Sequence, residues 1–244
     1  MTARQSIRSK FHKLRQRSRQ TGQVKLSVSA LMILAEAGIY LLLAAVLAGA
    51  VVFERSAPFG VALVGAAGSG LCGVAALVGA GFGYLSTMDL SGGLRYTSAA
   101  ILTFAVSFAF YDWRPLRRPW ATPAVATALT GFTGLIAMAQ STWRPIDAIY
   151  FVLELGLTAA ATWAFRQALA PLARKPEDQL ASPARRAGLL ALLCACLIAL
   201  APMTLYQDIS LGRIMAMIAV LATAWQGGPA TGAILGVVSG LSMD

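Results

Sequence analysis

The sequence predicts an all-α fold, a polytopic helical bundle embedded in a membrane, and three observations lead to this prediction. Hydrophobic residues make up 57% of the 244 residues and charged residues only 12%, where soluble domains have roughly 45–50% and about 25%. Apolar runs long enough to cross a bilayer core of roughly 30 Å recur along the chain. The connections between them are short and rich in Pro, Arg and Asp, so no soluble domain fits between the runs.

The first element is a basic tail over residues 1–26, which contains no acidic residue. Its basic residues are Arg4, Arg8, Lys10, Lys13, Arg15, Arg17, Arg19 and Lys25. Ile7, Phe11 and Leu14 add a short apolar edge at helical spacing. We expect an uncleaved cytoplasmic anchor that faces anionic lipid head groups, because each Lys or Arg near such a surface contributes about 1 kcal/mol.

Two other kinds of N-terminal segment compete with this interpretation. A cleaved signal peptide has an apolar run of about 7–15 residues, whereas the run at 27–52 is longer and disfavours that alternative. An organelle transit peptide is also rich in Arg and Ser and poor in acidic residues. That second alternative stays open.

Seven apolar runs follow the tail and form a membrane domain over residues 27–244. They lie near 27–52, 58–86, 95–111, 121–140, 146–169, 187–206 and 212–241. The last run is broken at Gly227, Gly228 and Pro229, because proline removes a backbone hydrogen bond and clashes with the preceding turn. With the long run at 58–86 also divided, the sequence predicts eight or nine transmembrane or half-spanning helices.

The distribution of basic residues decides how the run at 58–86 crosses the membrane. Lys and Arg collect in cytoplasmic loops. Two crossings around a turn at Gly68-Ser69-Gly70 place 16 of the 20 basic residues in the cytoplasm. These are eight of the tail, three after 95–111, Arg166 at the end of the run 146–169, and four after that run. Arg117 and Lys175 are among them. A single crossing would move the eight loop charges outside, so we predict two short helices and a cytoplasmic N-terminus.

Motifs for catalysis or for metal and nucleotide binding are weak. The only histidine is His12, which excludes a Ser-His-Asp set. Cys194 and Cys196 lack the further ligands that a zinc site requires. The G-x-G-x-x-G match over 68–73 lies in an apolar run and does not follow a strand, as a dinucleotide site would. We expect no catalytic residue, metal site, cofactor or nucleic-acid partner for this chain.

Glu36 and Glu154 lie inside predicted spans, where an ionised carboxylate costs at least ~2.5–3.5 kcal/mol. They indicate either an ion, proton or substrate site, or protonated carboxyls that hydrogen-bond neighbouring helices. Few basic residues occur in the spans to pair with them, so we expect the structural role, with Glu154→Gln close to the wild type. The alternative is a small transporter or substrate-binding subunit, with both acids facing a cavity between glycine-broken helices.

Gly232, Gly236 and Gly240 recur at every fourth position of the last run. Such a stripe lets a second helix approach closely, because side chains are missing along one face. The stripe predicts either self-association, and therefore a homo-oligomer, or packing within one chain.

Two groups of residues suggest a family. The first is Ser56-Ala57-Pro58-Phe59-Gly60 together with Ile146-Asp147-Ala148 and Val152-Leu153-Glu154-Leu155-Gly156-Leu157. The second is Arg213 followed by Gly227-Gly228 and by the string from Gly232 to Leu241. In this order they resemble the membrane region of the stage II sporulation protein E family of spore-forming bacteria, over most of 27–241.

The resemblance implies more than the composition does. Members of that family have about ten N-terminal membrane helices, a central regulatory region and a C-terminal PPM-type serine phosphatase with manganese. The phosphatase acts on an anti-sigma-factor antagonist, and the protein associates with the division machinery at the polar septum of the bacterial cell membrane. This sequence stops at Asp244, so no catalytic or manganese-binding residue can be carried over. We therefore expect a membrane-anchoring and oligomerising module, a fragment or split form that is not itself an enzyme.

Overall fold

A computed structural model describes residues 28–52, 56–111, 113, 118, 120–140, 144–169, 183–206 and 209–243. The basic tail and the loop residues Arg117 and Lys175 lie outside the described residues, so the predictions for them remain predictions. The chain divides into two compact units, Met1–Glu36 and Ala37–Asp244. All contacts discussed below lie within the second unit.

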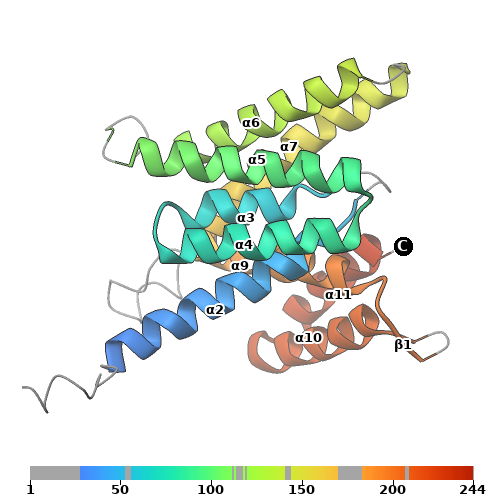
Figure 1. Ribbon diagram of the computed structural model, residues 1–244. Coiled ribbons are helices and arrows are strands. Elements are labelled where there is room, and N and C mark those ends of the chain that lie inside the picture. The colour runs from blue at the N-terminus through green and yellow to red at the C-terminus, as the bar shows by residue number, and fades with distance from the viewer. Residues whose placement is uncertain are drawn as a thin grey trace, which may run out of the picture. The chain divides into compact units, whose positions relative to one another are not determined.

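The described residues are almost all helical, which confirms the predicted all-α class (Figure 1). The helices are α2 (Val28–Ala48), α3 (Phe59–Ala67), α4 (Leu71–Thr87), α5 (Leu90–Ala109), α6 (Ala121–Ala139), α7 (Pro145–Ala168), α9 (Pro183–Leu200), α10 (Leu211–Gly227) and α11 (Pro229–Met243). Among the described residues, α6, α7, α9 and residues Leu31–Ala48 of α2 are long and apolar enough to cross a membrane. The expected eight or nine transmembrane or half-spanning helices stay a prediction.

Three helix boundaries differ from the predicted ones. The helix expected over 27–52 ends at Ala48, where Gly49 begins a turn. The helix expected over 187–206 ends at Leu200, because Pro202 cannot continue it; the chain then forms an antiparallel pair of short strands, β1 (Thr204–Tyr206) and β2 (Ile209–Ser210).

The third difference matters for the site described below. The helix expected over 95–111 begins at Leu90. Asp89 is its N-cap, and its carboxylate accepts hydrogen bonds from the Gly92 backbone N–H and the Ser91 hydroxyl. Such a cap satisfies N–H groups that the first turn of a helix leaves without partners. Arg95 therefore lies inside α5 and not at its entrance.

The run at 58–86 forms two helices, α3 and α4, on either side of Gly68–Gly70. Gly68 has φ +76°, a conformation that favours glycine. A Cβ at Gly73 would lie 1.9 Å from the Gly68 carbonyl oxygen, so the turn also requires glycine on its far side. The nine residues of α3 rise only about 14 Å, about half of a bilayer core of roughly 30 Å.

α3 is enclosed by its neighbours. It packs against α4, α5, α6 and α7, and every residue from Phe59 to Gly65 is buried. A short helix that ends at membrane depth leaves backbone groups without partners, and this is tolerated only where protein covers it. The enclosure of α3 meets that condition.

Small side chains make this close packing possible. A Cβ at Gly65 of α3 would touch Thr103 of α5, Ala126 of α6 and Thr162 of α7. Large apolar side chains point the other way, with Phe82, Phe132 and Val152 all more than half exposed. Small and hydroxyl-bearing residues therefore surround Gly65, although large side chains such as Tyr84 and Phe165 are also buried.

Two glycines of α4 give a matched pair of predictions. A Cβ at Gly79 would lie 2.1 Å from the Leu41 backbone oxygen of α2, whereas one at Gly81 would lie 3.6 Å from the Thr97 methyl group. We expect Gly79→Ala to lower the free energy of unfolding by about 1–3 kcal/mol through overpacking. Gly81→Ala should be neutral or stabilising by up to about 1 kcal/mol, because alanine favours a helix. Thermal unfolding in detergent checks both; equal melting temperatures for the two variants would contradict the close contact of α2 with α4.

Candidate functional site: a buried polar lock at the start of the half-helix

Two buried tyrosines hold the residues that lead into α3. The Tyr84 hydroxyl of α4 donates to the Ala57 carbonyl oxygen at 2.7 Å and accepts from the Val61 N–H at 2.9 Å. The Tyr96 hydroxyl of α5 accepts from the Ala57 N–H at 3.1 Å. The two rings stack with centroids 5.2 Å apart. Both polar atoms of Ala57 and one N–H of the first turn of α3 are thereby satisfied, as buried backbone requires.

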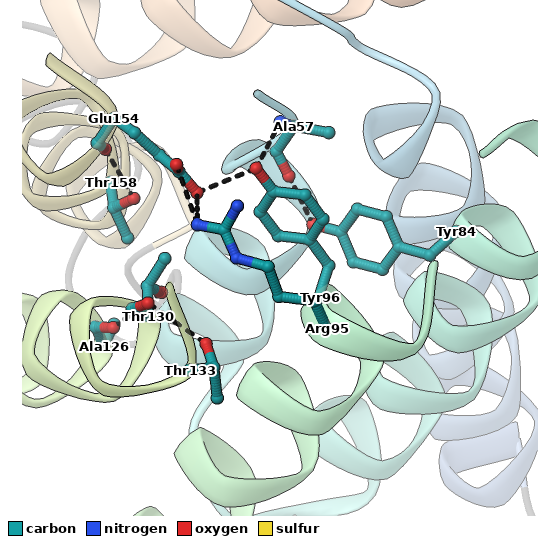
Figure 2. A network of polar contacts seen from close by, with 9 residues as sticks. All are labelled: Ala57, Tyr84, Arg95, Tyr96, Ala126, Thr130, Thr133, Glu154 and Thr158. Atoms are coloured by element: carbon teal, nitrogen blue, oxygen red, sulfur yellow. Dashed lines mark hydrogen bonds and ion pairs between the residues drawn. The ribbon is translucent and has the colours of Figure 1, made fainter. Parts of the chain in front are cut away.

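Glu154 of α7 continues this network (Figure 2). Arg95 Nη2 lies 2.8 Å from Oε1 and 2.9 Å from Oε2 of Glu154. The Tyr96 hydroxyl donates to Oε1 at 2.7 Å, and the Arg95 guanidinium lies 4.9 Å from the centre of the Tyr96 ring. Glu154 is only 5% exposed. Each of these groups donates to the carboxylate, which is the arrangement that an ionised, acceptor-only carboxylate needs.

The expectation that Glu154 lacks a basic partner is therefore wrong. Its partner lies on another helix, and the two residues are 59 positions apart in the chain. The predicted helix start at 95 placed Arg95 at the entrance of a helix, whereas the observed start at Leu90 carries it into the bundle. The protonated form of Glu154 was expected because burying an ionised carboxylate in a membrane span is costly. The ion pair with Arg95 largely offsets that cost.

Glu36 has a different environment. Its side chain is exposed on α2. Neither acid lines the groove beside Arg213 and Gly236 or the pocket beside Ser107 and Arg166. Glu36 and Glu154 therefore differ in burial, although both are acidic residues inside apolar runs of the sequence.

Threonine hydroxyls line the interior beside the ion pair. Thr158 donates to the Glu154 carbonyl oxygen at 2.8 Å, and Thr162 donates to the Thr158 carbonyl oxygen at 2.7 Å. On α6, Thr130 donates to Ala126 O at 2.9 Å. These hydroxyls bond to their own helices, so they let helices pack closely without needing partners across the interface.

The described residues include no group of three or more side chains suited to hold a metal ion. Arg95 Nε and Thr103 Oγ1 are among the buried side-chain atoms of the described residues that have no hydrogen-bond partner there. Chemically, the network links α4, α5 and α7 to the entrance of α3. It can fix the position of a short helix, and we assign no reaction to it.

The helix break falls at Gly227, Gly228 and Pro229, where the sequence predicts it. α10 ends at Gly227, Gly228 has φ +86°, and α11 begins at Pro229. The two helices pack against each other as a hairpin.

The glycine stripe on α11 divides into two parts. A Cβ at Gly232 would lie 2.5 Å from the Ala224 Cβ of α10, so this glycine packs within the hairpin. A Cβ at Gly236 would approach only Val220, at 3.8 Å, and one at Gly240 would meet nothing within 4 Å. These two glycines line an open groove of about 590 Å³ together with Arg213, Met217, Leu221 and Ser239.

Sequence reasoning missed Arg95, Tyr84 and Tyr96. A signal was present, because Arg95 and Tyr96 are adjacent polar residues in an otherwise apolar run. Their relevance depends on which residues of other helices they face, and a single sequence does not contain that information.

Comparison with known proteins gives one match. A family model described as "SpoIIE, N-terminal domain" matches residues 1–243. No curated protein and no solved structure matches the chain.

Proposed function

Because this chain belongs to the SpoIIE family, whose N-terminal domain corresponds to residues 1–243, we propose that it anchors a SpoIIE-type protein in the cell membrane and joins copies of it together. The observation that carries the anchoring role is the large number of big apolar side chains on the surface of the bundle. Phe82, Phe132 and Val152 face outward, while threonine hydroxyls and the Arg95–Glu154 pair are turned inward. A soluble protein rarely leaves such large apolar patches in water, whereas lipid covers them without cost.

By resemblance, the anchored activity is a manganese-dependent serine phosphatase that acts on an anti-sigma-factor antagonist at the polar septum, near the division machinery. Nothing in residues 28–243 is assigned to that chemistry. The role of this chain is to hold the phosphatase at the membrane and to set its local concentration by self-association. The buried network of Tyr84, Arg95, Tyr96 and Glu154 supports this role. A bundle whose helices are fixed by such contacts also fixes the position of the domain that it anchors.

The competing function is transport. It requires a cavity that Glu36 and Glu154 share. The exposure of Glu36 and the three donated hydrogen bonds that satisfy Glu154 favour the anchoring function.

The topology of the anchor can be tested directly. We expect Arg117→Cys and Lys175→Cys, each in a chain with Cys72, Cys194 and Cys196 replaced by serine, to resist an impermeant thiol reagent on intact cells and to react after permeabilisation. The reason is that basic loops stay in the cytoplasm. The protein should also remain in the membrane fraction after an alkaline carbonate wash. Loss from the membrane fraction would contradict anchoring, and labelling on intact cells would contradict the predicted orientation alone.

A further inference from the structure

A second pocket lies at the end of the bundle where α3 turns into α4. It has a volume of about 220 Å³, and its polar lining comes from Ser69, Ser107, Tyr111, Thr122 and Arg166. A single ordered water needs about 10–15 Å³ by the same measure. The pocket is therefore large enough for a group of several heavy atoms.

Arg166 gives this pocket a positive charge. It lies in the last turn of α7 and reaches across to α6, where Nη1 donates to the Thr122 hydroxyl at 2.7 Å and to the Arg118 carbonyl oxygen at 3.4 Å. α3, α5 and α7 end here and α6 begins here, so the helix dipoles together do not favour an anion. The guanidinium is the group that would attract one.

Ser107 is the second indication of a ligand. Its side chain is only 9% exposed and lines the pocket. A serine hydroxyl can donate one hydrogen bond and accept others, so Ser107 can donate to an anion that enters the pocket.

The surroundings of the pocket indicate its depth in the membrane. Tyr111, Trp113 and Trp120, which flank the loop between α5 and α6, are all more than half exposed. Tryptophan and tyrosine favour the level of the lipid head groups. The same loop contains Arg114, Arg117 and Arg118 in the sequence. The pocket thus opens where phosphate groups of lipids are abundant.

We propose that this pocket binds the phosphate of a phospholipid head group, with Arg166 as its ionic partner and the Ser107 hydroxyl as a hydrogen-bond donor. A phosphate group accepts several hydrogen bonds and pairs well with a guanidinium. Ser69, on the turn between α3 and α4, supplies a further hydroxyl. Bound lipid would then touch the turn that positions the enclosed half-helix. The inference rests on the membrane placement proposed above.

Native mass spectrometry of the full chain, extracted from membranes in detergent, tests the proposal. Phosphatidylglycerol and phosphatidylethanolamine are titrated separately, with and without inorganic phosphate. We expect one tight lipid site, which Arg166→Gln and Ser107→Val each weaken at least about tenfold, equivalent to about 1.4 kcal/mol. Ser98→Val, on the exposed side of the same helix, is the matched control and should leave the affinity unchanged.

Thermal unfolding separates a lost site from a lost fold. Ser107→Val replaces one small side chain by another that is favourable in a membrane helix, so this variant should melt close to the wild type even if Arg166→Gln does not. Equal lipid affinity of the wild type and a folded Ser107→Val would overturn the proposal. Inorganic phosphate that displaces the lipid at millimolar concentration would overturn it as well, because the site would then bind free phosphate. Failure to recover the chain from membranes would instead count against the anchoring function.

Discussion

Glu154→Gln should lower the free energy of unfolding by about 3 kcal/mol. Removing one partner of a buried ion pair leaves the other charge without compensation, and the typical cost is about 3–5 kcal/mol. The lower end is expected because the Arg95 side chain is 21% exposed and can recover some solvation. Glutamine still accepts a hydrogen bond from Tyr96, so the loss reports the ion pair and not the whole network. SDS-driven unfolding in mixed micelles measures the change.

A double-mutant cycle gives this prediction its controls. Arg95→Gln leaves Glu154 charged in an almost fully buried position, so it should cost more than Glu154→Gln, about 4 kcal/mol. The double variant should be more stable than the sum of the two losses predicts, since it leaves no unpaired charge. Glu36→Gln changes the same functional group at an exposed position and should not lower stability, because an uncharged side chain in a membrane span costs less than an ionised one. A Glu154→Gln variant as stable as the wild type would contradict this prediction and support the interpretation from the sequence, in which Glu154 is a protonated carboxyl.

The ion pair also marks the limit of prediction from this sequence. Composition and charge predict an all-α membrane protein, and the glycines at 68–70 and at 227–228 predict turns that the structure contains. These features depend on residues close together in the chain. The pairing of Arg95 with Glu154 depends on how α5 and α7 face each other, and on an α5 that begins five residues earlier than the apolar run does.

Helix faces were harder to predict than helices. A helix that is apolar all round gives no stripe that separates its lipid-facing side from its protein-facing side. Glu36 and Glu154 therefore look equivalent in sequence, although one is exposed and the other buried. For the same reason, the sequence does not predict that Tyr84 and Tyr96 point inward, or that the glycine stripe divides into two parts.

The division of the glycine stripe on α11 leads to a second prediction, on the self-association of the chain. Gly236→Leu should dissociate an oligomer of the chain and leave a folded monomer. The groove beside Gly236 and Gly240 has space for a helix of a second copy, and missing side chains would let its backbone come close and gain dispersion contacts. The Cβ of a residue at 236 would meet only Val220 within its own chain, at an ordinary distance, so a leucine side chain there would extend into the groove. We expect the dissociation constant to rise at least about tenfold.

Gly232→Leu is the matched control, because it places the same side chain one helical turn away on the same stripe. Its Cβ would overlap Ala224 within the hairpin of α10 and α11, so this variant should lower the melting temperature of the monomer itself through overpacking. Size-exclusion chromatography with light scattering, next to a thermal melt, distinguishes the two effects. An intact oligomer with an unchanged melt for Gly236→Leu would show that copies meet elsewhere. A destabilised Gly236→Leu monomer would instead show that the whole stripe packs inward, because only a filled groove makes an added side chain costly to a single chain.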